Sequence, residues 1–251
     1  MREGCARAMF PAMERVSGME NETLKADLRP DFRHVRNWVF DLDNTLYDAG
    51  NGIFSQIESR MTDYVVDFLG LPRDEARRRQ KDLYHQYGTT LNGLMVEHAC
   101  DAEHYLDFVH DIDLSSLAPD ADLIAAIQNL PGRRFVFTNG CRAHAARILD
   151  RLEMAQFFEL VWDIRTIGFA PKPDPSAYAR VVAAGGFDAT TAAMFDDLPR
   201  NLGPARALGM TTVWLKTDAP WAKQGPLAQA APGDIDHETE NLTQFLHNIR
   251  I

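Results

Sequence analysis

Residues 38–47 constrain this chain most, because an apolar run ends there at two acids. Residues 38–40 carry no charge, which predicts a buried strand that stops at Asp41 and Asp43. The end of such a strand lies at the rim of an open α/β sheet, where ligands bind. Two carboxylates this close repel each other, and burying either one without a partner is costly. The pattern therefore predicts a divalent cation or a proton between the acids, and a local Asx turn is the plainer alternative.

Charge and composition limit the partners of this chain. Its 251 residues carry a formal net charge of -10, and a negative surface repels phosphate backbones, so we expect no nucleic-acid partner. An anionic substrate would need local positive potential from a metal ion, a lysine or a helix N-terminus. No apolar run approaches the roughly 18 residues of a membrane span, so we expect no membrane partner. The cysteines Cys5, Cys100 and Cys141 are scattered and odd in number, which favours a reducing, cytoplasmic compartment.

Helical periodicity dominates residues 53–117. Apolar residues recur at helical spacing from Phe54 to Phe68, and Gly70 and Gly88 interrupt the pattern. Asp101 is a suitable cap for a further helix. The stretch reads as four helices without a convincing strand, so we predict a helical insert that lies outside the sheet.

From residue 118 onward, apolar strand patterns alternate with helical ones. Strands are expected at residues 134–137, 160–162, 192–195 and 211–215, and a last helix at 237–249. This alternation implies parallel βαβ units and a doubly wound α/β sheet.

The predicted organisation has three parts. They are a loosely ordered N-terminal extension (1–34), a catalytic core (35–52 and 118–251) and the helical insert (53–117).

Polar side chains follow four of the expected strands. They are Asp41 and Asp43, then Thr138 and Asn139, then Lys172, and finally Asp196 and Asp197. Neighbouring parallel strands lie about 4.8 Å apart, so these groups can converge at one edge of the sheet. Each one alone is explained by a turn, a solvated lysine or a helix cap. Together, in this order, they favour a single site.

Phosphoryl transfer through an aspartyl intermediate is the chemistry that uses such a set. Asp41 is placed to attack phosphorus in line, and Asp43 to protonate the leaving oxygen and later to deprotonate water. Mg²⁺ prefers octahedral oxygen coordination. Asp41, Asp197 and the carbonyl of Asp43 would supply it, with Asp196 binding directly or through water.

The remaining polar groups suit a phosphate. Thr138 and Asn139 would donate hydrogen bonds to its equatorial oxygens, and Lys172 would neutralise charge on the phosphate and on Asp41. This arrangement explains how an acidic protein can bind a small phosphorylated substrate.

Four strings in residues 36–215 resemble, in order and spacing, the motifs of the haloacid dehalogenase-like hydrolase superfamily: FDLDNTLY, FTNG, PKPDPSAY and MFDDLPRN. Within that superfamily the chain resembles the pyrimidine 5'-nucleotidase group. The strings that carry this resemblance are WVFDLDNTLY, YGTTLNGLM, FVHDIDL, PGRRFVFTNG, RAHAARIL and AAMFDDLPRNL. Several of them lie outside the catalytic motifs, which makes the assignment to the group more specific.

The resemblance implies a Rossmann-like sheet with an all-helical cap domain inserted after the first strand. It also implies Mg²⁺ as cofactor and hydrolysis of a nucleoside monophosphate, such as UMP or CMP, to nucleoside and phosphate. The implied roles are nucleophile Asp41, acid/base Asp43, phosphate ligands Thr138, Asn139 and Lys172, and metal ligands Asp41, Asp43, Asp196 and Asp197. Many superfamily members have Gly where Asp196 stands, and an extra carboxylate there is expected to tighten metal binding.

Other functions stay open beside this one. They are a phosphatase for another small ester (a sugar phosphate or phosphoglycolate), a phosphomutase, and an inactive binding scaffold. Dehalogenation needs neither a leaving-group proton nor a metal, so Asp43 and the pair Asp196 and Asp197 favour phosphate chemistry. An intact pair of Asp41 and Asp43 argues against an inactive scaffold. The oligomeric state is open between monomer and homodimer.

Substrate choice is expected to come from the insert, which would close over the site and exclude water. Residues 87–90 are predicted to form a turn that faces the site. Gly88 permits a tight backbone, Tyr87 is placed to stack on a base, and Thr89 and Thr90 to hydrogen-bond it. The alternative is that Tyr87 packs inside the insert.

Overall fold

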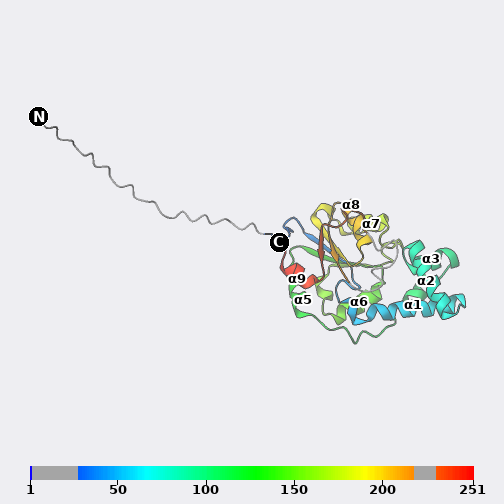
Figure 1. Ribbon diagram of the computed structural model, residues 1–251. Coiled ribbons are helices and arrows are strands. Elements are labelled where there is room, and N and C mark those ends of the chain that lie inside the picture. Colours follow the sequence, from blue (N-terminus) through cyan, green and yellow to red (C-terminus); the bar gives the residue numbers. More distant parts are fainter. Residues whose placement is uncertain (2–27, 218–229) are drawn as a thin grey trace.

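The computed structural model describes Met1, residues 28–217 and residues 230–251. Within these residues, six parallel strands form a central sheet in the order β3-β2-β1-β4-β5-β6 (Figure 1). This order confirms the predicted doubly wound α/β fold, and it puts β1 beside β4 at the point where the winding reverses. The strands are β1 (Asn37–Phe40), β2 (Arg133–Phe137), β3 (Leu160–Trp162), β4 (Ala192–Asp196), β5 (Thr211–Leu215) and β6 (His237–Thr239).

Helices cover both faces of the sheet (Figure 1). One face packs against α5 (Ala121–Gln128), α6 (Arg142–Arg151) and α9 (Leu242–His247). The other packs against α7 (Pro175–Gly185) and α8 (Leu202–Ala207). None of the helices in the described ranges has both the length and the apolar character of a membrane span.

Strand β1 is buried on both sides, which explains its uninterrupted apolar run. Trp38 and Phe40 point into the cluster under α5, α6 and α9, while Val39 points into the opposite cluster. Successive side chains of a strand alternate between the two faces, so one short segment anchors both layers.

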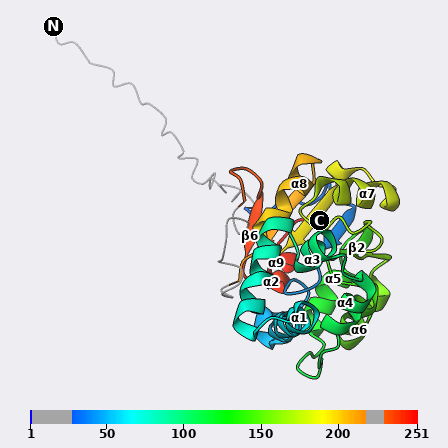
Figure 2. The ribbon, with the colours of Figure 1, turned by 90° about the vertical axis from the view of Figure 1, so that its right-hand side faces the viewer.

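The first four of the five α-helices between β1 and β2 form the predicted all-helical insert, and the fifth is α5, which packs on the sheet. The four helices of the insert are α1 (Ile53–Leu69), α2 (Arg73–Tyr87), α3 (Thr90–His98) and α4 (Ala102–Val109). Gly70 and Gly88 end α1 and α2 with φ angles of 65° and 82°, values that favour glycine. The insert extends from one end of the sheet (Figures 1 and 2). An ion pair between Arg165 and Glu103 of α4 ties it to the core.

The C-terminal segment differs from the prediction of one long helix at residues 237–249. His237–Thr239 instead forms strand β6, which pairs with the edge of β5 from Val213 to Leu215. Backbone pairing with an open sheet edge outweighs the local helical pattern here. Helix α9 is correspondingly short.

Most of the predicted N-terminal extension, residues 2–27, lies outside the described residues. Its end, however, reaches the core. Phe32 is fully buried, its ring stacks on Trp38 with centroids 5.9 Å apart, and Asp31 bridges to Arg250. The last residues before β1 are therefore part of the hydrophobic core.

Candidate active site

The acids singled out in the sequence converge where β1 and β4 end. The strands pair Phe40 with Phe195, so Asp41 and Asp196 leave the sheet side by side. The Asp41 backbone N–H donates a 2.8 Å hydrogen bond to the Phe195 carbonyl, which extends the pairing by one residue. Asp41, Asp196 and Asp197 are all buried, and one carboxylate oxygen of each lies within 4.8 Å of the other two.

Lys172 lies at the centre of this cluster, with only 1% of its surface exposed. Its Nζ donates to Asp41 Oδ1 at 2.7 Å, to Asp196 Oδ2 at 2.7 Å and to the Phe137 carbonyl at 2.8 Å. Burial by itself would lower the pKa of Lys172, but Asp196 and Asp41 outweigh it and raise that pKa. The lysine is therefore a permanent cation whose three N–H groups are all used.

The charges of the cluster do not balance within the protein. Three carboxylates face one ammonium group, which leaves two negative charges in excess when all are ionised. Burial, reinforced by the neighbouring acids, raises the pKa of Asp41 to about 7 and that of Asp197 well above its usual range. Asp197 Oδ2 is buried and has no hydrogen-bond partner among residues 28–217 and 230–251. An orphaned carboxylate oxygen beside surplus negative charge fits a hard divalent cation.

Asp196 has a different environment from Asp197. Its Oδ1 accepts hydrogen bonds from the Leu198 backbone N–H and from Asn201 Nδ2, both at 2.9 Å, and its Oδ2 is bound to Lys172. Both oxygens of Asp196 are thus occupied by protein donors. Asp197 is the better candidate for direct metal binding, and Asp196 holds the lysine in place.

Asp43 lies apart from the three-carboxylate cluster, so only its backbone carbonyl remains as the predicted metal ligand. Its Oδ1 accepts from Tyr47 Oη at 2.6 Å and from His144 Nε2 at 2.8 Å. Burial acts to raise the pKa of Asp43, but His144 and Tyr47 outweigh it and lower that pKa to about 2. These contacts hold one oxygen of Asp43 and leave the other for chemistry.

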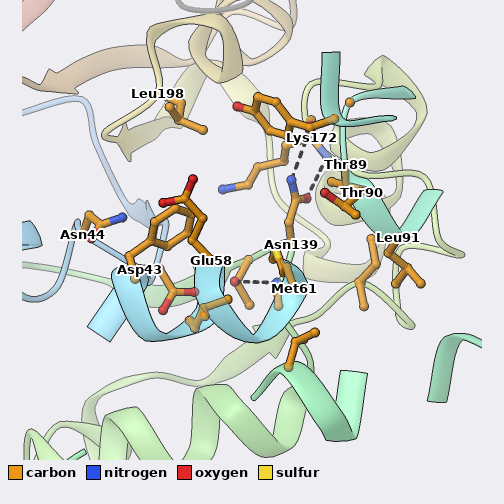
Figure 3. Close-up of a pocket in the computed structure, with 18 of the residues that line it drawn as sticks. Asp43, Asn44, Glu58, Met61, Thr89, Thr90, Leu91, Asn139, Lys172 and Leu198 are labelled. Atoms are coloured by element: carbon orange, nitrogen blue, oxygen red, sulfur yellow. Dashed lines mark hydrogen bonds between the residues drawn. The ribbon is translucent and has the colours of Figure 1, made fainter. Parts of the chain in front are cut away.

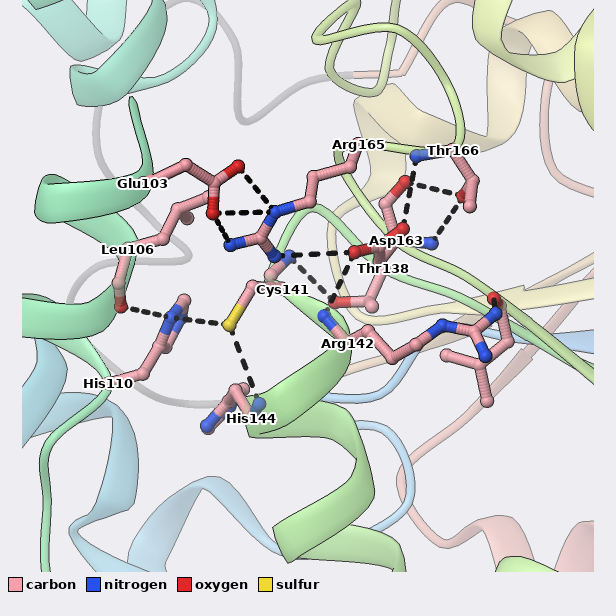
Figure 4. Close-up of polar contacts among 12 residues, drawn as sticks. Glu103, Leu106, His110, Thr138, Cys141, Arg142, His144, Asp163, Arg165 and Thr166 are labelled. Carbon is pink, nitrogen blue, oxygen red and sulfur yellow. Dashed lines mark hydrogen bonds and ion pairs between the residues drawn. The ribbon is translucent and has the colours of Figure 1, made fainter. Parts of the chain in front are cut away.

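Sequence reasoning missed His144, which lies in the first turn of α6, directly after the Thr138 loop (Figure 4). Its ring stacks on His110, with centroids 4.3 Å apart, and Cys141 Sγ lies 3.4 Å from His110 Nδ1. Burial lowers the pKa of His110 to about 3, so that ring is neutral at pH 7. The available signal was a histidine in the helix that follows a candidate phosphate loop.

The side chains of Thr138 and Asn139 make different contacts in the site. Thr138 lines the pocket, and its Oγ1 accepts from the Gly140 backbone N–H at 2.9 Å. Asn139 Oδ1 accepts from the Lys172 backbone N–H at 2.8 Å, and its Nδ2 donates to the Lys172 carbonyl at 3.2 Å (Figure 3). The Asn139 side chain therefore fixes the lysine loop, whereas the sequence suggested that it would donate to a phosphate.

A pocket lies between the insert and the sheet edge. Asp43 and Lys172 of the core and Thr89, Thr90 and Leu91 of the insert all line it (Figure 3). Helices α1 and α4 add mostly apolar side chains to its wall, and α2 adds Gln80, Lys81, Tyr84 and His85. The polar end of the pocket is thus the acidic cluster, and its other end is formed by the insert.

The predicted turn at residues 87–90 meets this pocket only in part. Gly88 lines it, but Tyr87 does not. The Tyr87 ring packs so closely on α3 that a Cβ at Gly93 would lie 3.0 Å from it. Tyr84, one turn earlier in α2, lines the pocket instead. The expectation that Tyr87 stacks on a base is therefore corrected: its ring faces the insert.

The two threonines of this turn line the pocket and also hold the insert together. Thr89 Oγ1 caps α3 by accepting from the Asn92 backbone N–H at 3.1 Å. Thr90 Oγ1 donates to the Gln80 carbonyl at 3.3 Å. Both hydroxyls therefore have structural partners already, which limits what they can offer to a ligand.

Comparisons with known proteins agree with this geometry. The model of the haloacid dehalogenase-like hydrolases matches residues 35–209. "Phosphate metabolism protein 8" of Saccharomyces cerevisiae is 29% identical over 190 residues, a match that covers 69% of this chain and 59% of the yeast protein. "Phosphatase MT3486" of Mycobacterium tuberculosis is 28% identical over 196 residues, covering 68% of this chain and 83% of that protein.

The match thus spans less than two thirds of the yeast protein's own length. Among solved structures, a HAD phosphatase from Thermococcus onnurineus superposes with a TM-score of 0.57 at 18% sequence identity, over 86% of this chain and 100% of that one. At this sequence identity the superposition is evidence of a shared fold alone.

Proposed function

Since this chain belongs to the haloacid dehalogenase-like hydrolases, we propose that it is a phosphoric monoester hydrolase that works through a phospho-aspartate. The observation that carries the proposal is the convergence of Asp41, Asp196 and Asp197 where β1 and β4 end, with Lys172 bound to the first two. The name of the mycobacterial relative, a phosphatase, supports the same class of reaction.

In the proposed reaction, Asp41 is the nucleophile. Lys172 holds its Oδ1, so Oδ2 would form the bond to phosphorus while the P–O bond of the ester breaks. The leaving oxygen would take its proton from the unheld oxygen of Asp43. This carboxyl is ionised in the free protein, where its pKa is about 2, and would take up the proton as the anionic phosphate binds beside it and raises that pKa. A water molecule would then attack the phospho-aspartate and return its proton to Asp43, which frees phosphate and restores Asp41.

The charge on the phosphoryl group needs a counterpart beyond Lys172. Asp41, Asp197 and the backbone carbonyl of Asp43 would hold Mg²⁺, which supplies positive charge for the phosphate. The orphaned Oδ2 of Asp197 supports this assignment. Thr138 would donate its hydroxyl to a phosphate oxygen, because it lines the same pocket.

We further propose that the substrates are nucleoside 5'-monophosphates, with a pyrimidine such as in UMP or CMP. The resemblance of several strings to the pyrimidine 5'-nucleotidase group supports this choice, as does an apolar pocket beside the acidic cluster. In this proposal residues 35–52 and 118–251 bind the phosphate and residues 53–117 form the cap over the leaving group.

The test is phosphate release from UMP, CMP, ribose 5-phosphate and phosphoglycolate, with Mg²⁺ and with EDTA. We expect release only with metal and fastest from the two nucleotides. Asp41→Asn is expected to abolish turnover, since an amide cannot form the acyl phosphate. Asp150→Asn, an exposed change on α6, serves as the control and is expected to keep wild-type turnover. Turnover retained in Asp41→Asn would refute the covalent mechanism.

A further inference from the structure

Arg200 is a buried cation that the proposed reaction does not use. It lies in the short 3-10 helix Pro199–Asn201 that follows β4 and Asp197, it lines the pocket, and only 8% of its surface is exposed. Its Nη2 donates to the Gly88 carbonyl of the insert at 3.4 Å. Its Nε and Nη1 are buried and make no hydrogen bond to the described residues.

A buried guanidinium with unpaired N–H groups destabilises the folded protein unless a ligand supplies hydrogen-bond acceptors for them. Buried N–H groups without acceptors lose the hydration that they have in water, and the penalty is larger for a charged group. The Tyr84 ring lies under the guanidinium, with Cζ 4.6 Å from the ring centroid. This contact and the Gly88 carbonyl orient the guanidinium, so its free N–H groups are held ready for an acceptor.

The rest of the pocket indicates what that acceptor is. The Tyr105 hydroxyl from α4 also lines it, is 2% exposed as a residue and has no hydrogen-bond partner in the described part of the chain. The wall between these polar groups is largely apolar, which suits a flat organic ring. Glu58 (Figure 3) and Lys81 line the same pocket and pair with each other at 3.9 Å, so their charges offset one another. A neutral carbonyl oxygen costs less to bury against this apolar wall than a second phosphate or a carboxylate, so it is the better acceptor for Arg200.

We propose that Arg200 is a specificity-determining residue that donates to a carbonyl oxygen on a planar ring of the leaving group, such as O2 of a pyrimidine. This inference rests on the proposed phosphatase function and adds to it the chemistry by which the leaving group is recognised. One short segment after β4 then carries both tasks: Asp197 serves the phosphate end of the substrate, and Arg200, three residues later, serves the ring end.

The test compares two substrates on each protein. We would measure kcat/KM for UMP and for ribose 5-phosphate, which has the same phosphate and sugar but no base. In the wild type the ratio of the two values is expected to favour UMP strongly. In Arg200→Met it is expected to fall about 10- to 100-fold, the effect of losing a hydrogen bond to a charged group. In Arg200→Lys the ratio is expected to fall less, because lysine keeps the charge but lacks the planar, forked guanidinium.

Arg206→Met is the matched control. Its guanidinium pairs with Asp236 at 3.1 Å near the surface and does not line the pocket, so the ratio is expected to stay at the wild-type value. Because each ratio compares two substrates on one protein, a partial folding defect lowers both values and cancels.

The possible results separate the inference from the function beneath it. A ratio in Arg200→Met equal to that of the wild type would overturn the inference, as would a wild type that hydrolyses ribose 5-phosphate as well as UMP; both leave the phosphatase proposal standing. A wild type that releases phosphate from no ester would instead overturn the proposed function, and the inference with it.

Discussion

Replacing Lys172 by methionine tests the electrostatic account of the site. Methionine has nearly the same length and fills the same space, but it offers no N–H and no charge. The variant loses three short hydrogen bonds, to Asp41, Asp196 and the Phe137 carbonyl, at a position that is 1% exposed. It therefore leaves two buried carboxylates without their cation.

Removing one partner of a buried ion pair costs about 3–5 kcal/mol, because the remaining charge stays buried and unpaired. We expect a loss of that size in the free energy of unfolding at pH 8 without metal. The loss is expected to be smaller at pH 5. Burial already raises the pKa of Asp41 to about 7, and losing the lysine raises it further, so at lower pH Asp41 takes up a proton and part of the unpaired charge disappears.

The assay is urea unfolding in EDTA at both pH values, with the slope m compared to confirm two-state behaviour. Lys216→Met is the control, since that lysine is 37% exposed in its side chain and pairs with Glu238 at 3.3 Å on the surface. It should change stability by no more than about 0.5 kcal/mol. A loss below about 1 kcal/mol in Lys172→Met at pH 8, or a greater loss at pH 5, would contradict the reasoning.

Two further predictions concern the same site. His144→Ala is expected to lower kcat about 10-fold or more with little change in KM, because His144 positions Asp43 rather than the substrate. His144→Gln is expected to recover much of the lost kcat, since its amide can donate to the same oxygen of Asp43. Equal losses of kcat in both variants would argue against a positioning role. In metal-free protein the pKa of Asp41 is about 7 when folded against an ordinary 3.8, so the folded state holds a proton that the unfolded state lacks and stability should fall as pH rises from about 4 to about 7. Thermal melts in EDTA should show that Tm falls with rising pH, and added Mg²⁺ should reverse this pH dependence. The same pH dependence of Tm in Asp41→Asn would contradict the assignment to Asp41.

Much of the fold could be predicted from the sequence because it depends on short-range patterns. The apolar run before Asp41 identified β1, since a strand buried on both faces favours apolar side chains at successive positions, here Trp38, Val39 and Phe40. The alternation after residue 118 identified the parallel sheet, and helical spacing identified the insert. Strand β6 was not predicted because its stability comes from pairing with β5, and its own residues do not show that pairing.

The site was predictable to the level of strand ends, and less so beyond them. Asp41, Asp196 and Asp197 meet because parallel strands deliver their last residues to one edge. The partner of each polar atom depends on the course of the loops. Asn139 therefore binds the Lys172 backbone, and Tyr84 takes the place expected for Tyr87, since three residues along a helix are nearly one full turn.

The sequence by itself determined the α/β class, the helical insert and the strand ends that carry the acids, because strand and helix periods are written in consecutive residues. Only the tertiary structure decided that Asp197 Oδ2 has no hydrogen-bond partner among the described residues, which histidine holds Asp43 and that Arg200 enters the pocket beneath the insert. Those contacts join residues up to 112 positions apart, such as Arg200 and Gly88, and depend on how the insert packs against the sheet. No local pattern encodes that packing, since it is set by the shapes of both surfaces together.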